Sequence, residues 1–186
     1  MIDLKTFFDE MVNEALTQRK LNTYPMVSKY LVDLLQFYTL SDNFENSETL
    51  AEMYLKAMQE ESQALKTEKL KKLGDMSLYI SGFFGDSLKR KVVDIDYYAD
   101  IGGQAYKCLA QEIQEDTFSK VYGVMSTNFL DFVDVLTIVS QKSLVQSNED
   151  LLRLYDRYVT TGSELARDQL LEKGLIPTEE TKKTKQ

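Results

Sequence analysis

The chain has 186 residues, of which 43% are hydrophobic and 28% are charged, with a formal net charge of −8 and no histidine. Because histidine is the usual general base near neutral pH and a common metal ligand, its absence argues against most hydrolase and metalloenzyme chemistries in a single copy of the chain. The strong acidity argues against a nucleic-acid partner, since nonspecific affinity for nucleic acid depends on neutralising phosphates.

Hydropathy and cysteine usage predict the compartment. No stretch approaches the roughly 18 uninterrupted apolar residues of a membrane span, and the N-terminus lacks the pattern of a signal peptide. The single cysteine, Cys108, has no partner for a disulfide within the chain. We therefore expect a cytoplasmic protein of one domain, without a membrane span.

The N-terminal half predicts four helices. Apolar residues at 4–16 recur at helical spacing, and Pro25 suits the first turn of a second helix that ends before a polar loop at 41–47. A third helix is expected to begin near Ser47 or Thr49, the latter standing three residues before Glu52 as in a capping box. The fourth helix is expected to be capped by Thr67 and to continue to Phe84, before Gly85.

The C-terminal half predicts longer helices. A helix at 96–115 contains two adjacent glycines, Gly102 and Gly103, which favour close packing of a neighbour because glycine is otherwise costly in a helix. One continuous helix is expected at 117–140, through the centre of the core, and a last helix at 147–174. Together these patterns predict an all-α, single-domain bundle of about six or seven helices over residues 1–177, with a disordered tail at 178–186.

Three features that resemble catalytic or metal sites have simpler interpretations. Residues 85–88 read Gly-Asp-Ser-Leu, a string found in a lipase family, but they follow a helix in mid-chain and no histidine is available to a serine nucleophile. Cys108 is expected to be a small core residue. Asp94, Asp96 and Asp100 are expected to cap and precede a helix rather than to hold a cation. We expect no catalytic residue, metal or cofactor.

Basic residues are concentrated in one part of this acidic chain. Residues 66–91 hold seven basic residues against three acidic ones. Such a cluster is often only a solvated helix face, but it also suits an acidic protein segment or a phosphorylated ligand.

Several runs around this cluster carry a resemblance. The runs are LGDMSLYISGFF at 73–84, DSL at 86–88, VDIDYY at 93–98 and GGQAY at 102–106, with shorter likenesses at 161–163 and 174–177. In these runs the chain resembles a group of bacterial hypothetical proteins of about the same length. The resemblance implies a bacterial helical domain and implies nothing about a reaction or a partner.

Two functions remain open at this point. The first is a non-enzymatic interaction or regulatory module that binds a protein partner through the 82–100 connection, with self-association as a further alternative. Its candidate binding residues are Phe83, Phe84, Asp86, Lys89, Arg90, Lys91, Asp96, Tyr97 and Tyr98. The second is a small-ligand-binding bundle in which Arg90 or Lys91 contacts an anionic group. Its candidate pocket residues are Tyr79, Phe83, Tyr98, Tyr106 and Tyr122.

Overall fold

The computed structural model describes residues 4–40, 48–83 and 95–143, together with Tyr158, Glu164, Leu165, Arg167 and Leu170. Over these residues the chain forms seven α-helices and no strand, so the predicted all-α single-domain bundle is confirmed. The predicted last helix at 147–174 lies largely outside the described residues, and the predicted tail lies entirely outside them.

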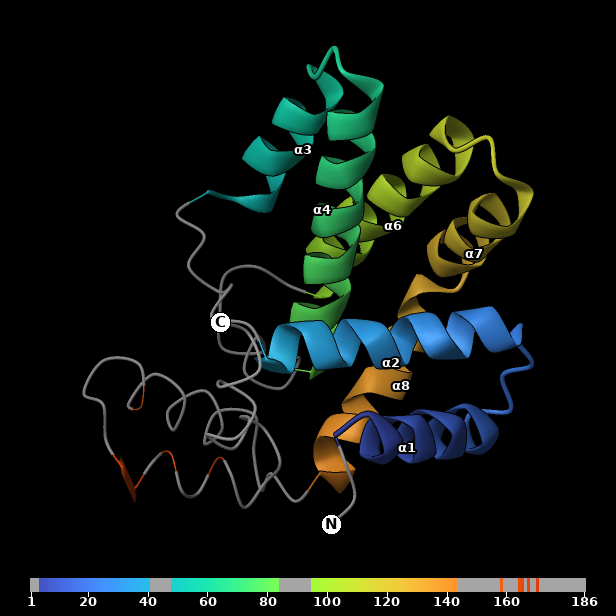
Figure 1. Cartoon of the computed structure of the whole chain (residues 1–186), viewed down its shortest axis with the longest axis vertical. Helices are drawn as coiled ribbons and strands as arrows, with labels where there is room; N and C mark the ends of the chain where they lie inside the picture. The colour runs from blue at the N-terminus through green and yellow to red at the C-terminus, as the bar shows by residue number, and fades with distance from the viewer. Residues whose placement is uncertain are drawn as a thin grey trace, which may run out of the picture.

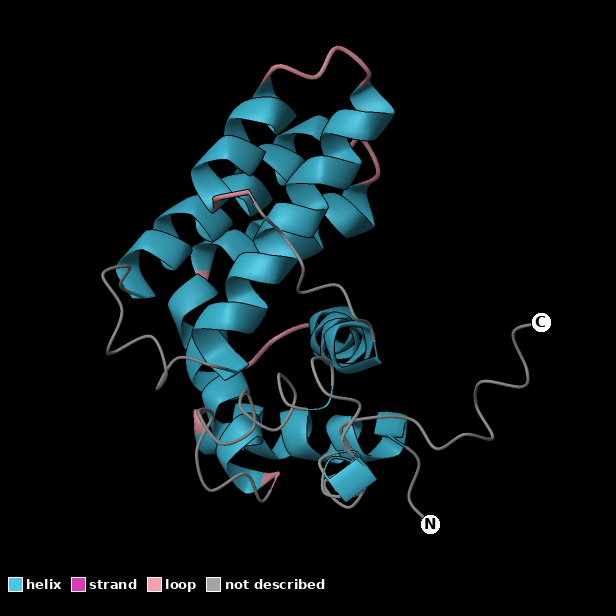
Figure 2. Cartoon of the chain, turned by 90° about the vertical axis from the view of Figure 1, so that its left-hand side faces the viewer, coloured by secondary structure: helices cyan, strands magenta, loops and turns pink. Residues whose placement is uncertain are grey.

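The helices pack in two groups that meet at α4. In chain order they are α1 (Leu4–Gln18), α2 (Pro25–Leu40), α3 (Leu50–Met58), α4 (Gln63–Phe83), α6 (Ile95–Glu112), α7 (Asp116–Thr127) and α8 (Phe129–Lys142). Figure 1 shows α2 crossing the lower end of α4, with α1 beside α2 and packed on α8, while α3 and α6 lie along α4 and α7 packs on α6. Figure 2 shows the connections that the structure describes, at 19–24, 59–62, 113–115 and 128, as short loops. Among the described helices, α4 packs mainly against α6 and α8.

The second half of α4 is the central element of the fold. Residues 73–79 are all buried, which is the pattern of a helix covered on every side. The helix begins at Gln63, so the prediction that Thr67 caps it is wrong. The Thr67 hydroxyl instead donates to the carbonyl oxygens of Gln63 and Ala64, one turn back inside the helix, at 3.1 and 2.9 Å.

Two other predicted helix starts are confirmed. Pro25 is the first residue of α2, where its missing N–H removes no helical hydrogen bond. Thr49 caps α3 in a complete capping box, because its hydroxyl accepts from the backbone N–H of Glu52 at 3.2 Å. The Glu52 carboxylate in turn accepts from the backbone N–H of Thr49 at 2.8 Å.

The predicted continuous helix at 117–140 is divided into α7 and α8, which bend by 81° at Asn128. The bend allows the ring of Phe129 to pack against α6 at Gly102, where a Cβ atom would lie only 2.6 Å from Phe129 Cε2. The Ser126 hydroxyl also donates to the carbonyl oxygen of Gly103 at 2.8 Å. Packing against α6 therefore accompanies the break, and the prediction of one continuous helix is wrong.

A helix must be both long and apolar to cross a bilayer. Within the described residues, no single helix has both the length and the apolar composition needed. Taken together, α7 and α8 meet both criteria, but they are the pair that bends at Asn128.

Candidate ligand-binding site

A buried carboxylate joins three helices near the middle of the protein. Asp75, on α4, has a side chain only 8% exposed. Its Oδ1 atom accepts hydrogen bonds from the hydroxyls of Tyr30 on α2 and of Tyr106 on α6, the latter at 2.7 Å. Its Oδ2 atom lies 2.5 Å from the ammonium nitrogen of Lys71. A buried carboxylate is costly unless it is paired and hydrogen-bonded, and these three partners meet that requirement.

Aromatic rings surround this carboxylate and hold the hydroxyls in place. Tyr106 stacks on Tyr122 of α7 with ring centroids 6.1 Å apart, and Tyr30 meets Tyr122 edge-on at 5.6 Å. A glycine makes the approach of Tyr106 to α4 possible, since a Cβ atom on Gly74 would lie 2.8 Å from Tyr106 Cε1. The ring can therefore lie against the α4 backbone and deliver its hydroxyl to Asp75.

The protonation of the tyrosines follows from their burial. Loss of water around the rings, together with the nearby Asp75 carboxylate, raises the pKa values of the Tyr30 and Tyr106 hydroxyls well above the ordinary value. The same two causes raise the pKa of Tyr122 to about 12. These hydroxyls stay protonated near neutral pH, which suits hydrogen-bond donation rather than proton abstraction.

A cavity of about 570 Å³ opens beside the carboxylate. Its lining residues belong to α2, α4 and α7. Phe37 and Phe118 are exposed aromatic residues in its lining, whereas Tyr38 and Tyr122 are buried. The complete lining comprises Tyr30, Asp33, Leu34, Phe37, Tyr38, Glu68, Lys71, Lys72, Asp75, Phe118 and Tyr122. Aromatic walls with a few converging polar groups are typical of small-molecule sites.

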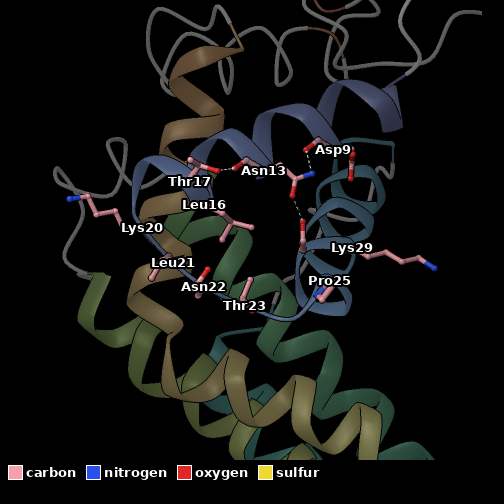
Figure 3. Close-up of a pocket in the computed structure, with 11 residues that line it drawn as sticks. Asp9, Asn13, Leu16, Thr17, Lys20, Leu21, Asn22, Thr23, Pro25 and Lys29 are labelled. Atoms are coloured by element: carbon pink, nitrogen blue, oxygen red, sulfur yellow. Dashed lines mark hydrogen bonds between the residues drawn. The ribbon is translucent and has the colours of Figure 1, made fainter.

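A second cavity, of about 650 Å³, lies between α1, α2 and the connection that joins them. Figure 3 shows that its two lysines, Lys20 and Lys29, point away from it. In its lining Asn13 accepts from the Ser28 hydroxyl at 2.9 Å and donates to the carbonyl oxygen of Asp9 at 2.8 Å (Figure 3). Because it contains no buried charge comparable to Asp75, it offers less chemistry for recognising a ligand.

The structure describes four of the residues predicted for the 82–100 surface. Phe83 is fully buried in the core, where its ring stacks on Tyr79 with the ring centroids 5.2 Å apart, so it is not an outward contact residue. Asp96 is exposed on the first turn of α6, and Tyr97 and Tyr98 are half-buried and meet edge-to-face at 5.7 Å. The other five, Phe84, Asp86, Lys89, Arg90 and Lys91, lie outside the described residues. Binding of a protein partner through this surface stays a prediction.

The residues predicted to line one ligand pocket lie in different parts of the structure. Tyr122 lines the cavity and Tyr106 hydrogen-bonds to the carboxylate at its base. Tyr79 and Phe83 instead belong to the core, and Tyr98 does not line the cavity. Arg90 and Lys91, the predicted anion contacts, lie outside the described residues.

The buried Asp75 carboxylate and the residues of α2 that line the cavity were not identified from the sequence. The site depends on Tyr30, Tyr38, Lys71 and Asp75, none of which was predicted as a site residue. One signal could have identified Asp75, since it is the only charged residue between Lys72 and Asp86, in a run otherwise suited to burial.

The described part of the basic cluster is largely paired with acids. Besides the contact of Lys71 with Asp75, Lys66 lies 2.6 Å from Glu112. Lys69 lies 2.5 Å from Glu60. These pairs reduce the local positive charge on α4 that the sequence suggested for an acidic or phosphorylated partner.

The remaining candidates show no catalytic arrangement within the described residues. Cys108 is partly buried, with its Sγ atom 3.8 Å from the Tyr54 hydroxyl and accepting from the Gln104 amide at 3.5 Å. In the same described residues, no group of three or more His, Cys, Asp or Glu side chains is placed to hold a metal. No protein-family model, curated protein or solved structure matches this chain.

Proposed function

We propose that this chain is a non-enzymatic helical protein that binds a small organic ligand in the cavity between α2, α4 and α7. The observation that carries the proposal is the position of the cavity, which is open at the surface and reaches a buried carboxylate held by Tyr30, Lys71 and Tyr106. Buried charge beside a concave aromatic surface is more typical of recognition sites than of ordinary cores.

The chemistry of the lining supports binding of a ligand with an aromatic or apolar body. Phe37 on α2 and Phe118 on α7 contribute ring surface that the fold itself leaves exposed. Burying such surface against a ligand is favourable, at about 25 cal/mol for each Å² of apolar area removed from water. The tyrosine hydroxyls and the charged groups would then fix the orientation of the bound molecule.

The proposal can be tested by ligand-observed NMR with a set of small aromatic compounds that carry a cationic, a neutral or an anionic group. We expect some of these compounds to bind the parent protein. Replacing Phe37 or Phe118 by alanine should weaken binding, because each substitution removes ring surface from the lining. Leu130→Ala is the matched control, since Leu130 on α8 is as exposed as Phe37, at 54%, and lies outside the lining.

Two results would contradict this function. In the first, none of the compounds binds the folded parent. In the second, compounds bind, but Phe37→Ala, Phe118→Ala and Leu130→Ala all retain the parent affinity, so that the binding lies elsewhere on the protein.

A further inference from the structure

The ammonium group of Lys71 marks a position in the cavity that suits a cation. Its Nζ atom lies 2.5 Å from Asp75 Oδ2 and 5.2 Å from the centroid of the Tyr30 ring. A carboxylate attracts an ammonium by charge and hydrogen bonding, and the face of an aromatic ring attracts it through the ring quadrupole. The protein thus presents two complementary groups to one positive charge.

The anionic part of this pair is fixed, whereas the cationic part is free to exchange. Asp75 is 8% exposed, and its other oxygen is held by two tyrosine hydroxyls from different helices. The Lys71 side chain is 48% exposed and reaches the carboxylate through a flexible four-carbon stem. Its ammonium can move into water without disturbing the packing of the core.

The charges of the lining favour a second cation once Lys71 has moved away. The lining contains three carboxylates, on Asp33, Glu68 and Asp75, and two ammonium groups, on Lys71 and Lys72. With the Lys71 side chain in solvent, three negative charges face one positive charge. An anionic ligand would meet repulsion there, while an organic cation would restore the balance.

We propose that the ligand is an organic ammonium compound with an aromatic or apolar body, and that its ammonium replaces that of Lys71 on Asp75. This inference rests on the proposed function and names the ligand class for the same cavity. The body of the ligand would lie against the exposed rings of Phe37 and Phe118, and its charge would lie between Asp75 and the face of Tyr30.

Calorimetric titration with three probes of similar size tests the charge preference. The probes are 2-phenylethylammonium, the neutral 2-phenylethanol and the anionic 3-phenylpropionate. We expect the ammonium probe to bind roughly tenfold more tightly than the alcohol, from one charge-assisted hydrogen bond and one cation–π contact. The carboxylate probe should bind more weakly than either.

A lysine variant tests the displacement. Lys71→Met keeps the length of the stem and removes the competing ammonium, so it should raise the affinity for 2-phenylethylammonium by about two- to fivefold, the range expected for loss of one exposed ion pair. Lys69→Met is the matched control. Lys69 also lies on α4, is 44% exposed and pairs with a carboxylate at 2.5 Å, but it does not line the cavity.

The outcomes separate this inference from the proposed function. If the alcohol or the carboxylate binds as tightly as the ammonium probe, or if Lys71→Met leaves unchanged or weakens ammonium binding, the inference is overturned while a binding cavity remains. If none of the three probes binds the parent or either variant, both the inference and the proposed function fail.

Discussion

Two adjacent glycines on α6 should respond to the same substitution with opposite signs. In Gly102→Ala, the added Cβ atom would lie 2.6 Å from both Phe129 Cε2 and Ser77 Cβ. Both neighbours are buried, so neither can move easily. Overpacking of this kind costs about 1–3 kcal/mol, and contacts on two sides place Gly102 at the upper end. The better helix propensity of alanine returns about 1 kcal/mol, which leaves a net destabilisation of about 2 kcal/mol.

At Gly103 the balance is reversed. The nearest atoms to an added Cβ are Ser126 O at 3.8 Å and Phe129 Cβ at 3.9 Å, which are ordinary van der Waals distances. Gly103→Ala should therefore keep most of the gain in helix propensity and stabilise the protein by about 0.5–1 kcal/mol. Gly123→Ala on α7, where nothing lies within 4 Å of an added Cβ, is a second variant expected to stabilise.

Urea unfolding followed by circular dichroism measures both effects. For a chain of this size, a loss of about 2 kcal/mol should also lower the melting temperature by roughly 4–8 °C. The packing described for α4, α6 and α8 would be refuted if Gly102→Ala were as stable as the parent, or if Gly103→Ala were destabilised to the same extent as Gly102→Ala.

Three further predictions concern a helix cap, the pH dependence of stability and the basic residues at 89–91, which lie outside the described residues. Thr49→Ala should lower the free energy of unfolding by about 0.5–2 kcal/mol in urea titrations, because α3 loses its cap; an unchanged midpoint would contradict the capping box. Burial raises the pKa of Tyr122 from 10.0 to about 12. The stability that the protonated Tyr122 hydroxyl contributes is therefore complete below pH 10 and should be lost as the pH rises toward 12. In unfolding experiments, Tyr122→Phe should flatten this alkaline loss of stability. Charge reversal of the three basic residues at 89–91 should slow association with a captured protein partner in a salt-dependent way. Charge reversal of the three tail lysines within 182–185 is the control and should leave association unchanged. If both variants bind the partner as well as the parent does, the 82–100 surface is not the docking site.

The features that the sequence predicted correctly depend on local chemistry. The capping box at Thr49 and Glu52 involves residues three apart, and the start of α2 at Pro25 follows from the fixed backbone of proline. The helical class follows from apolar periodicity within each segment. The close packing expected for the glycines of 96–115 is also confirmed at Gly102.

The features that were missed depend on contacts between distant residues. Periodicity alone gives a charged residue such as Asp75 no reason to be buried. Its burial is possible because hydroxyls arrive from Tyr30, 45 residues away, and from Tyr106, 31 residues away. The bend at Asn128 likewise accompanies packing of Phe129 against α6, which no pattern within 117–140 contains.

The shared carboxylate also affects how the protein opens. Asp75 on α4 receives hydrogen bonds from both α2 and α6. If α2 separated from the rest of the fold, the carboxylate would lose the Tyr30 hydroxyl and Tyr106 would lose an edge-on aromatic neighbour. Opening of the α1–α2 hairpin therefore costs interactions made by Asp75 on α4 and by Tyr106 on α6. We expect the slowest amide hydrogens of α2 to exchange together with those of α4 and α6, as one cooperative unit rather than as a hairpin that detaches first.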